Sequence, residues 1–145
     1  MQIKDIMTRG VEVVSPQTTL QEAAARMRSL DVGPLPVCDG DRIEGMVTDR
    51  DIVVRGIAEG RDPRTTKVSE VMTRDVVTCA ESDDVKVAAR TMKERQVRRL
   101  LVVDANKKVS GIVSLGDVAV EGDDRMSGDV LEKVSTPSTK GATRA

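Results

Sequence analysis

Hydrophobic residues recur along this chain in a pattern that occurs twice. In each half, four apolar residues follow one another at i, i+3, i+4 and i+7, which predicts a helix with one buried face. The four are Leu20, Ala23, Ala24 and Met27 in the first half and Val85, Ala88, Ala89 and Met92 in the second. A short β-rich run precedes each helix, and two strands and a further helix follow it. The predicted order is therefore β-α-β-β-α, twice.

The bounds of these elements come from the apolar runs and the turn residues between them. The predicted strands cover residues 11–14, 35–38 and 43–48, then 76–79, 100–103 and 109–114, and the second helices begin near Asp49 and Leu115. Thr18 and Gln21 are predicted to form the capping box of the first helix. A three-stranded sheet with both helices on one face leaves apolar surface uncovered. We therefore expect an α/β (α+β) fold, with two repeats packed about a pseudo-twofold axis.

The two halves are also similar residue by residue. A shift of 65 positions places Met7-Thr8-Arg9 on Met72-Thr73-Arg74, and further matches follow in order with one single-residue insertion. The expected organisation is a first repeat at 1–60, a hinge at 61–65, a second repeat at 66–123 and a mobile polar tail at 124–145. Met7 and Met72 begin equivalent segments and are expected to pack between the repeats.

Composition narrows the functional classes. The 145 residues include no histidine and no Phe, Tyr or Trp, and the net charge is −1. Without histidine the usual general base and the commonest zinc ligand are missing, so we expect no enzyme and no required cofactor. Without aromatic residues or a basic excess, nucleic acid is not an expected partner. No apolar stretch is long enough for a membrane span and no secretory signal is seen, so a cytoplasmic protein is expected.

A motif with chemical meaning occurs once in each half, at Gly45–Asp51 and Gly111–Asp117, with the form G-h-h-[ST]-x-x-D. It places a hydroxyl at the end of a strand and a carboxylate one turn into the next helix. That hydroxyl and the helix N-terminus suit an anion, and the carboxylate can accept hydrogen bonds from a ribose diol. The same spacing is also an ordinary helix cap. Its occurrence at equivalent positions of both halves favours a ligand site.

The two halves share the duplicated unit, the I-M-T and V-M-T segments, the L-P-V-C-D and L-L-V-V-D strands and the glycine-to-aspartate motif. Together these features resemble a tandem cystathionine-β-synthase (CBS) domain pair over residues 3 to about 120. The resemblance implies a regulatory homodimer that binds AMP, ADP, ATP, NAD or S-adenosylmethionine. It implies that ribose is held by Thr48 with Asp51 and by Ser114 with Asp117. It also implies that adenine is read by main chain of the partner repeat. These wall residues are Val77, Thr78 and Cys79 opposite Asp51, and Val14 and Ser15 opposite Asp117.

The two clefts are not expected to be equal. The second repeat has Arg98-Arg99 before its second strand, where the resemblance implies a basic pair facing phosphate, and the first repeat has Gly33-Pro34 there. Because partners cross in such pairs, Arg98 and Arg99 are expected to serve the ligand held by Asp51. Arg50 is a further candidate for that cleft. Alternatively, both arginines are solvated turn residues paired with nearby acids.

Two other functions stay open at this point. One is a dimerisation adaptor that binds no ligand, and the other is a thiol or metal stress sensor built on Cys38 and Cys79. We expect both thiols to be buried, apolar and inert. No sequence feature identifies a downstream protein partner.

Overall fold

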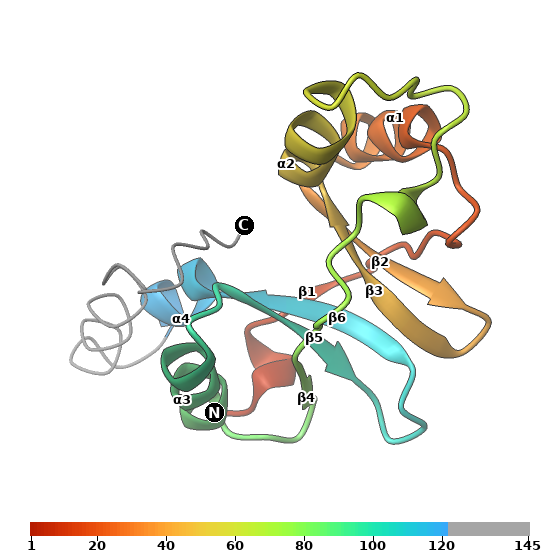
Figure 1. The fold of residues 1–145 in the computed structure, drawn as a ribbon. Helices are drawn as coiled ribbons and strands as arrows, with labels where there is room; N and C mark the ends of the chain where they lie inside the picture. Colours follow the sequence, from red (N-terminus) through yellow and green to blue (C-terminus); the bar gives the residue numbers. More distant parts are fainter. Residues whose placement is uncertain (122–145) are drawn as a thin grey trace. The chain divides into compact units, whose positions relative to one another are not determined.

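The computed structural model describes residues 1–121, which form two compact units (Figure 1). The first-repeat unit is Val11–Val76, and the second-repeat unit joins Met1–Gly10 to the described residues from Val77 onward. The leading segment of each repeat therefore belongs to the compact unit that contains the rest of the other repeat. The predicted tail at 124–145 lies outside the described residues.

The first-repeat unit begins with helix α1 (Leu20–Leu30), which buries Leu20, Ala23 and Met27. Its capping box is formed by Thr19 and Glu22, one residue later than predicted. Thr18 instead closes a turn, since its N–H donates to Ser15 O at 3.1 Å. Ala24, predicted in the apolar face, is exposed.

A hairpin follows α1 in this unit. Strands β2 (Pro34–Asp39) and β3 (Arg42–Thr48) pair antiparallel with a bulge at Val37/Cys38. The predicted strand at 11–14 was wrong in extent: it is reduced to one parallel bridge between Val14 and Val37, because the neighbouring Val13 and Ser15 face solvent. After β3 come α2 (Asp49–Asp51) and the π-helical η2 (Ile52–Ile57), and α1 packs against β2 and η2.

The leading segment of the second repeat completes this unit. In η3 (Val68–Glu70) and just after it, Val68, Val71 and Met72 are buried with the apolar residues of α1, β2 and β3. Thr73 then pairs with Met46 through two backbone hydrogen bonds of 2.9 Å each. Met72 therefore packs in the core of the first-repeat unit, and the residue after it pairs with β3.

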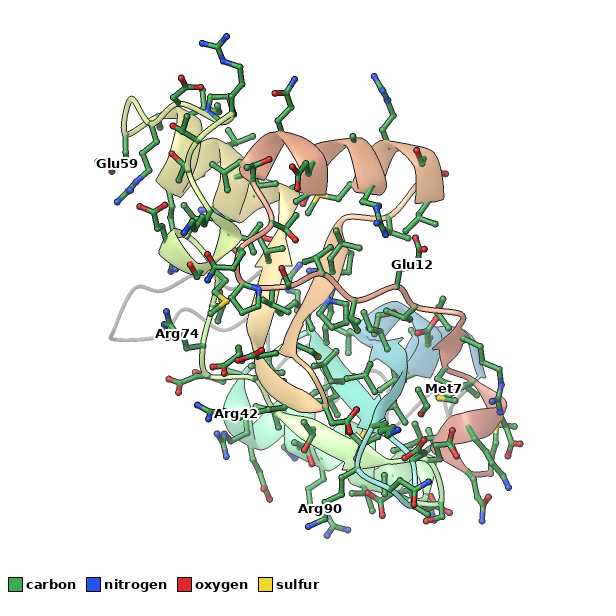
Figure 2. The ribbon with its side chains drawn as sticks, turned by 90° about the vertical axis from the view of Figure 1, so that its right-hand side faces the viewer. Met7, Glu12, Arg42, Glu59, Arg74 and Arg90 are labelled. Carbon is green, nitrogen blue, oxygen red and sulfur yellow. The ribbon has the colours of Figure 1, made fainter. Side chains whose placement is uncertain are left out.

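The second-repeat unit has the same plan in a more regular form. Its sheet has the order β1-β6-β5-β4, made by β1 (Thr8–Arg9), β6 (Val109–Ser114), β5 (Arg99–Val103) and β4 (Thr78–Ala80). Only the β4–β5 pair is parallel. The leading segment, with η1 (Ile3–Asp5) and β1, supplies the outer strand, and Met7 is buried beside it (Figure 2).

Two helices complete the second-repeat unit. Helix α3 (Val85–Arg95) is capped by Asp84 and buries the four apolar residues predicted for it, and α3 packs against α4 (Leu115–Glu121). Arg90 of α3 points away from the core (Figure 2). The mixed α/β fold of two β-α-β-β-α repeats is confirmed.

Candidate functional site

The carboxylate of the first repeat is part of a buried helix cap. Thr48 ends β3, and its N–H donates to Asp51 Oδ2 at 3.0 Å, while Thr48 Oγ1 accepts from the Asp51 N–H at 3.1 Å. Both residues are buried, at 5% and 7% exposure. The motif therefore forms the helix cap that its spacing allows. Oδ1 of Asp51 takes no part in the cap.

The second repeat repeats this cap in a more open setting. The Ser114 N–H donates to Asp117 Oδ2 at 2.8 Å, and Ser114 Oγ accepts from the Asp117 N–H at 3.1 Å. Both residues are only half-buried. A cap uses one carboxylate oxygen, so it does not prevent the other oxygen from accepting bonds from a ligand.

A hollow of about 280 Å³ lies beside the Ser114 cap, within the second-repeat unit. Its lining is Arg98, Arg99, Ser114, Leu115, Gly116 and Ala119. The strands explain this grouping: Arg99 stands opposite Ser114 in the β5–β6 ladder, and Arg98 O accepts the Leu115 N–H at 2.8 Å.

One atom of Arg99, a residue that lines this hollow, lacks a hydrogen-bond partner within the described part of the chain. Nη1 of Arg99 is buried, yet it has no hydrogen-bond partner among the residues that the structure describes. A buried guanidinium N–H without an acceptor is costly, and such groups in native proteins call for an explanation. An acceptor supplied by a bound anion would satisfy it.

Arg98 and Arg99 line a hollow within their own unit, together with Ser114. That they serve a ligand held by Asp51 stays a prediction. The alternative that they pair with nearby acids finds no support within residues 1–121, where neither forms an ion pair with a described acid. In the first repeat Pro34, which carries no charge, stands opposite Thr48.

The predicted wall residues of the second-repeat unit lie on β4 and just before it. Val77 O accepts the Leu101 N–H at 3.1 Å, and Thr78 is exposed. The side chain of Cys79 packs in the core, and its Sγ lies 3.8 Å from Leu101 O. Cys79 can therefore contribute only main chain to a ligand site.

The wall residues of the first-repeat unit lie at a second hollow, of about 480 Å³, alongside α1. Val13, Val14 and Ser15 line it with polar groups of α1, among them Glu22 and Arg26. Val14 is itself buried, and Ser15 Oγ accepts the Gln17 N–H at 3.3 Å. Arg50, the remaining candidate, is exposed, and its own N–H donates to Asp49 Oδ1.

An arginine that was not among the predicted site residues lies one turn after Asp51. Nε of Arg55 is 3.9 Å from Asp51 Oδ1, and Nη1 donates to the carbonyls of Val71 and Met72 at 3.3 and 3.4 Å. The i,i+4 spacing of an acid and an arginine was the available signal.

Both cysteine thiols are buried, and neither forms a disulfide. Burial, reinforced by the Asp83 carboxylate, raises the pKa of Cys79 to about 12. Burial also raises the pKa of Cys38, with smaller contributions from Asp41 and Glu44. A thiol with a raised pKa is a poor nucleophile and a poor metal ligand at neutral pH. Among residues 1–121, no three or more Cys, Asp or Glu side chains are grouped as a metal site would require.

Two copies of one β-α-β-β-α unit, each with a hydroxyl–carboxylate cap after its third strand, define a tandem-repeat module. The CBS domain family model matches residues 3–56 and 68–122. The chain belongs to the CBS domain family and is a CBS pair, a regulatory type of module. No helix within the described part of the chain is long and apolar enough to cross a membrane.

Relatives and solved structures agree with this assignment. The CBS domain-containing protein YhcV of Bacillus subtilis is 43% identical over 134 residues, covering 92% of this chain and 94% of YhcV. The crystal structure of Hypoxic Response Protein I with two coordinated zinc ions matches with a TM-score of 0.73 and 38% identity, over 85% of this chain and all of that one. CBSX2 in complex with AMP matches with a TM-score of 0.66 and 29% identity, over 82% and 93% of the two chains.

Proposed function

We propose that this CBS pair binds an adenine nucleotide at its second repeat and acts as an energy or ligand sensor. Arg98 and Arg99 receive the phosphate, and Asp117, held by Ser114, accepts the ribose diol. The observation that carries this proposal is Arg99, which lines a hollow together with Ser114 and whose buried Nη1 has no hydrogen-bond partner among residues 1–121.

The charges of the hollow favour a nucleotide over a simple anion. Two arginines can neutralise a phosphate, and a guanidinium binds it with two parallel hydrogen bonds. A carboxylate close to the same hydroxyl repels phosphate and suits a neutral diol. A ligand with an anionic end and a diol end fits this arrangement in one orientation only. The AMP bound to CBSX2 has both features.

The first-repeat cleft and the adenine wall complete the proposal. We keep the main chain at 77–79 and at 14–15 as candidates for reading adenine, with aliphatic side chains in place of aromatic ones. Thr48 and Asp51 are proposed as a second diol site without a basic pair of its own repeat. Regulation then follows from a difference in nucleotide affinity between two states of the module.

The test is titration calorimetry with adenosine, AMP, ADP, ATP, NAD and S-adenosylmethionine. Arg99→Gln is expected to weaken AMP binding by about 10- to 100-fold, as for a lost charge-assisted hydrogen bond, and to leave adenosine almost unchanged. Asp117→Ala should weaken the binding of AMP and of adenosine by the same factor. Arg90→Gln is the matched control, because Arg90 is an exposed arginine of the same repeat. Equal losses of AMP and adenosine in Arg99→Gln would contradict the assigned role, and no binding of any ligand would favour the adaptor function.

A homodimer is the assembly we propose for this module, with η2 as its contact surface. Among the described residues, six large hydrophobic side chains are exposed, and three of them, Val53, Val54 and Ile57, lie in η2. Arg50 precedes this patch and Glu59, which points outward, follows it (Figure 2). Antiparallel pairing of two copies would bring these opposite charges together and bury the patch twice.

Light scattering after size exclusion tests this assembly. Val54→Asp is expected to convert the dimer to a monomer, while Leu30→Asp, an exposed apolar site on α1, should not. A wild-type monomer at all protein concentrations would refute the proposed dimer.

A further inference from the structure

Arg55 makes the two carboxylates of the module unequal. Its guanidinium lies beside the Asp51 oxygen that the helix cap leaves unused, with Nε 3.9 Å from Oδ1. The same guanidinium is anchored by Nη1, which donates to the carbonyls of Val71 and Met72. Two hydrogen bonds and one ion pair therefore place Arg55 beside Asp51, although 57% of the arginine side chain is exposed.

The second repeat lacks this arrangement. Asp117 forms no ion pair with any cation in the described part of the chain. The position that matches Arg55, four residues after Asp117, is occupied by Glu121. Asp117 is also half-buried, whereas Asp51 is 7% exposed. A diol can reach a half-open carboxylate with a free oxygen more readily than a buried one beside a cation.

We propose that Arg55 is an internal occupant of the first-repeat site, so that a nucleotide diol binds Asp51 only by displacing it. The chain then has one strong site, at Ser114 and Asp117, and one weak site, at Thr48 and Asp51. Arg55 sets the difference between them. This inference rests on the proposed nucleotide binding and specifies which site fills first.

A second difference points in the same direction. The strong site has Arg99 opposite Ser114, and the first repeat has Pro34 opposite Thr48. The first repeat therefore lacks the phosphate contact and has a competitor for its diol contact. Either difference alone favours the second site, and together they give an ordered filling of two sites.

The experiment removes the strong site and then the competitor. In Asp117→Ala protein, calorimetry with AMP should report only the weak site, and adding Arg55→Gln should tighten it by about three- to fivefold, the effect of losing one largely exposed ion pair. If Asp117→Ala binds no detectable AMP, the double variant should regain measurable binding. Arg28→Gln, an exposed arginine of α1, is the control and should change nothing. Unchanged or weaker AMP binding in the double variant, or two equal sites in the wild type, would overturn the proposal.

A measurement without nucleotide separates this inference from the proposed function. In a double-mutant cycle of Asp51→Asn and Arg55→Gln, followed by urea unfolding, the two destabilisations should be less than additive because the residues interact. Arg55→Lys should retain part of the coupling between the two residues. Lysine keeps the positive charge but lacks the guanidinium Nη1 that donates to the carbonyls of Val71 and Met72. If no nucleotide binds but the coupling is present, the proposed function fails and the pairing of Arg55 with Asp51 stands. Strict additivity would overturn the pairing itself.

Discussion

Gly45 lies directly against the carbonyl of Thr73: a Cβ added to this glycine would stand 2.5 Å from Thr73 O. The second repeat has the same relationship, with 2.7 Å between a Cβ on Gly111 and Thr8 O. The glycine that opens each G-h-h-[ST]-x-x-D motif is therefore required by the leading segment of the other repeat, which pairs with the strand at this point. Its role is structural, while the hydroxyl and carboxylate of the motif serve the cap and the proposed site.

Substitution of Gly45 by alanine should destabilise the fold markedly. The added methyl group must push Thr73 away and break the two 2.9 Å hydrogen bonds between Thr73 and Met46, at a cost of about 2–4 kcal/mol. The free energy of unfolding from urea titration measures this loss. Gly116→Ala is the control: a Cβ there would meet only Ser114 Oγ at 3.6 Å, so stability should be unchanged or up to about 1 kcal/mol higher. A loss in Gly45→Ala no larger than in the control would refute the steric role.

The exchange of leading segments predicts which fragments fold. A fragment of residues 11–76 contains a whole compact unit, including Val68, Val71 and Met72 of its core. A fragment of residues 1–65 is the first repeat by sequence but lacks these three buried side chains, each contributing about 1.5–3 kcal/mol. We expect circular dichroism and dispersed NMR amide signals to show a folded 11–76 fragment and an unfolded 1–65 fragment. A cooperative unfolding transition in fragment 1–65 would mean that the leading segment of the second repeat is dispensable for folding of the first.

Much of this fold could be predicted because it depends on local periodicity. Helix α3 buries the predicted Val85, Ala88, Ala89 and Met92, and the third strands end in Thr48 and Ser114 as the motif requires. These features need only the sequence of one repeat. The error of one residue in the first capping box has a local cause as well, since Thr18 and Thr19 are both able to cap and backbone geometry decides between them.

Other features depend on contacts that a repeat does not encode by itself. The similarity of Met7 to Met72 shows that their segments are equivalent, but not that each completes the sheet of the opposite repeat. Arg98 and Arg99 precede a strand in the sequence, and only the pairing of β5 with β6 places Arg99 opposite Ser114. The unequal charge of the two repeats can be read from the sequence, whereas the assignment of the arginines to a ligand of Asp51 stays a prediction. Arg55 was missed because its partners include carbonyls 16 and 17 residues away.

Removal of the Thr48 hydroxyl should destabilise the first-repeat unit. Thr48→Ala leaves the Asp51 N–H without its 3.1 Å acceptor in a buried setting, at a cost of about 1–2 kcal/mol. Thr48→Ser keeps the acceptor and should cost clearly less. Thermal unfolding followed by circular dichroism compares the two variants. Equal losses in alanine and serine would show that the methyl group of Thr48, rather than its hydroxyl, stabilises this position.

The Cys79 thiol makes the stability of the second-repeat unit depend on pH in the alkaline range. Its pKa is about 12 in the folded protein and 9.0 in the reference state, because burial and the nearby Asp83 carboxylate disfavour the thiolate. Below pH 9 both states keep the proton and the thiol adds no pH dependence. Between pH 9 and 12 the unfolded chain releases the proton while the folded chain retains it, so stability falls as pH rises, by at most ~1.4 kcal/mol per pH unit.

Urea unfolding of wild type and Cys79→Ala at several pH values isolates this contribution. The variant loses a buried sulfur and should be less stable by a constant amount below pH 9. The difference in unfolding free energy between wild type and variant should then decrease steadily toward pH 11, because only the wild type has the Cys79 thiol that ionises on unfolding. The same protonation predicts slow reaction of Cys79 with a disulfide reagent at neutral pH and fast reaction in urea. A constant gap up to pH 11, together with rapid modification of the folded protein, would show that Cys79 is ionisable in the native state and would return the thiol sensor to consideration.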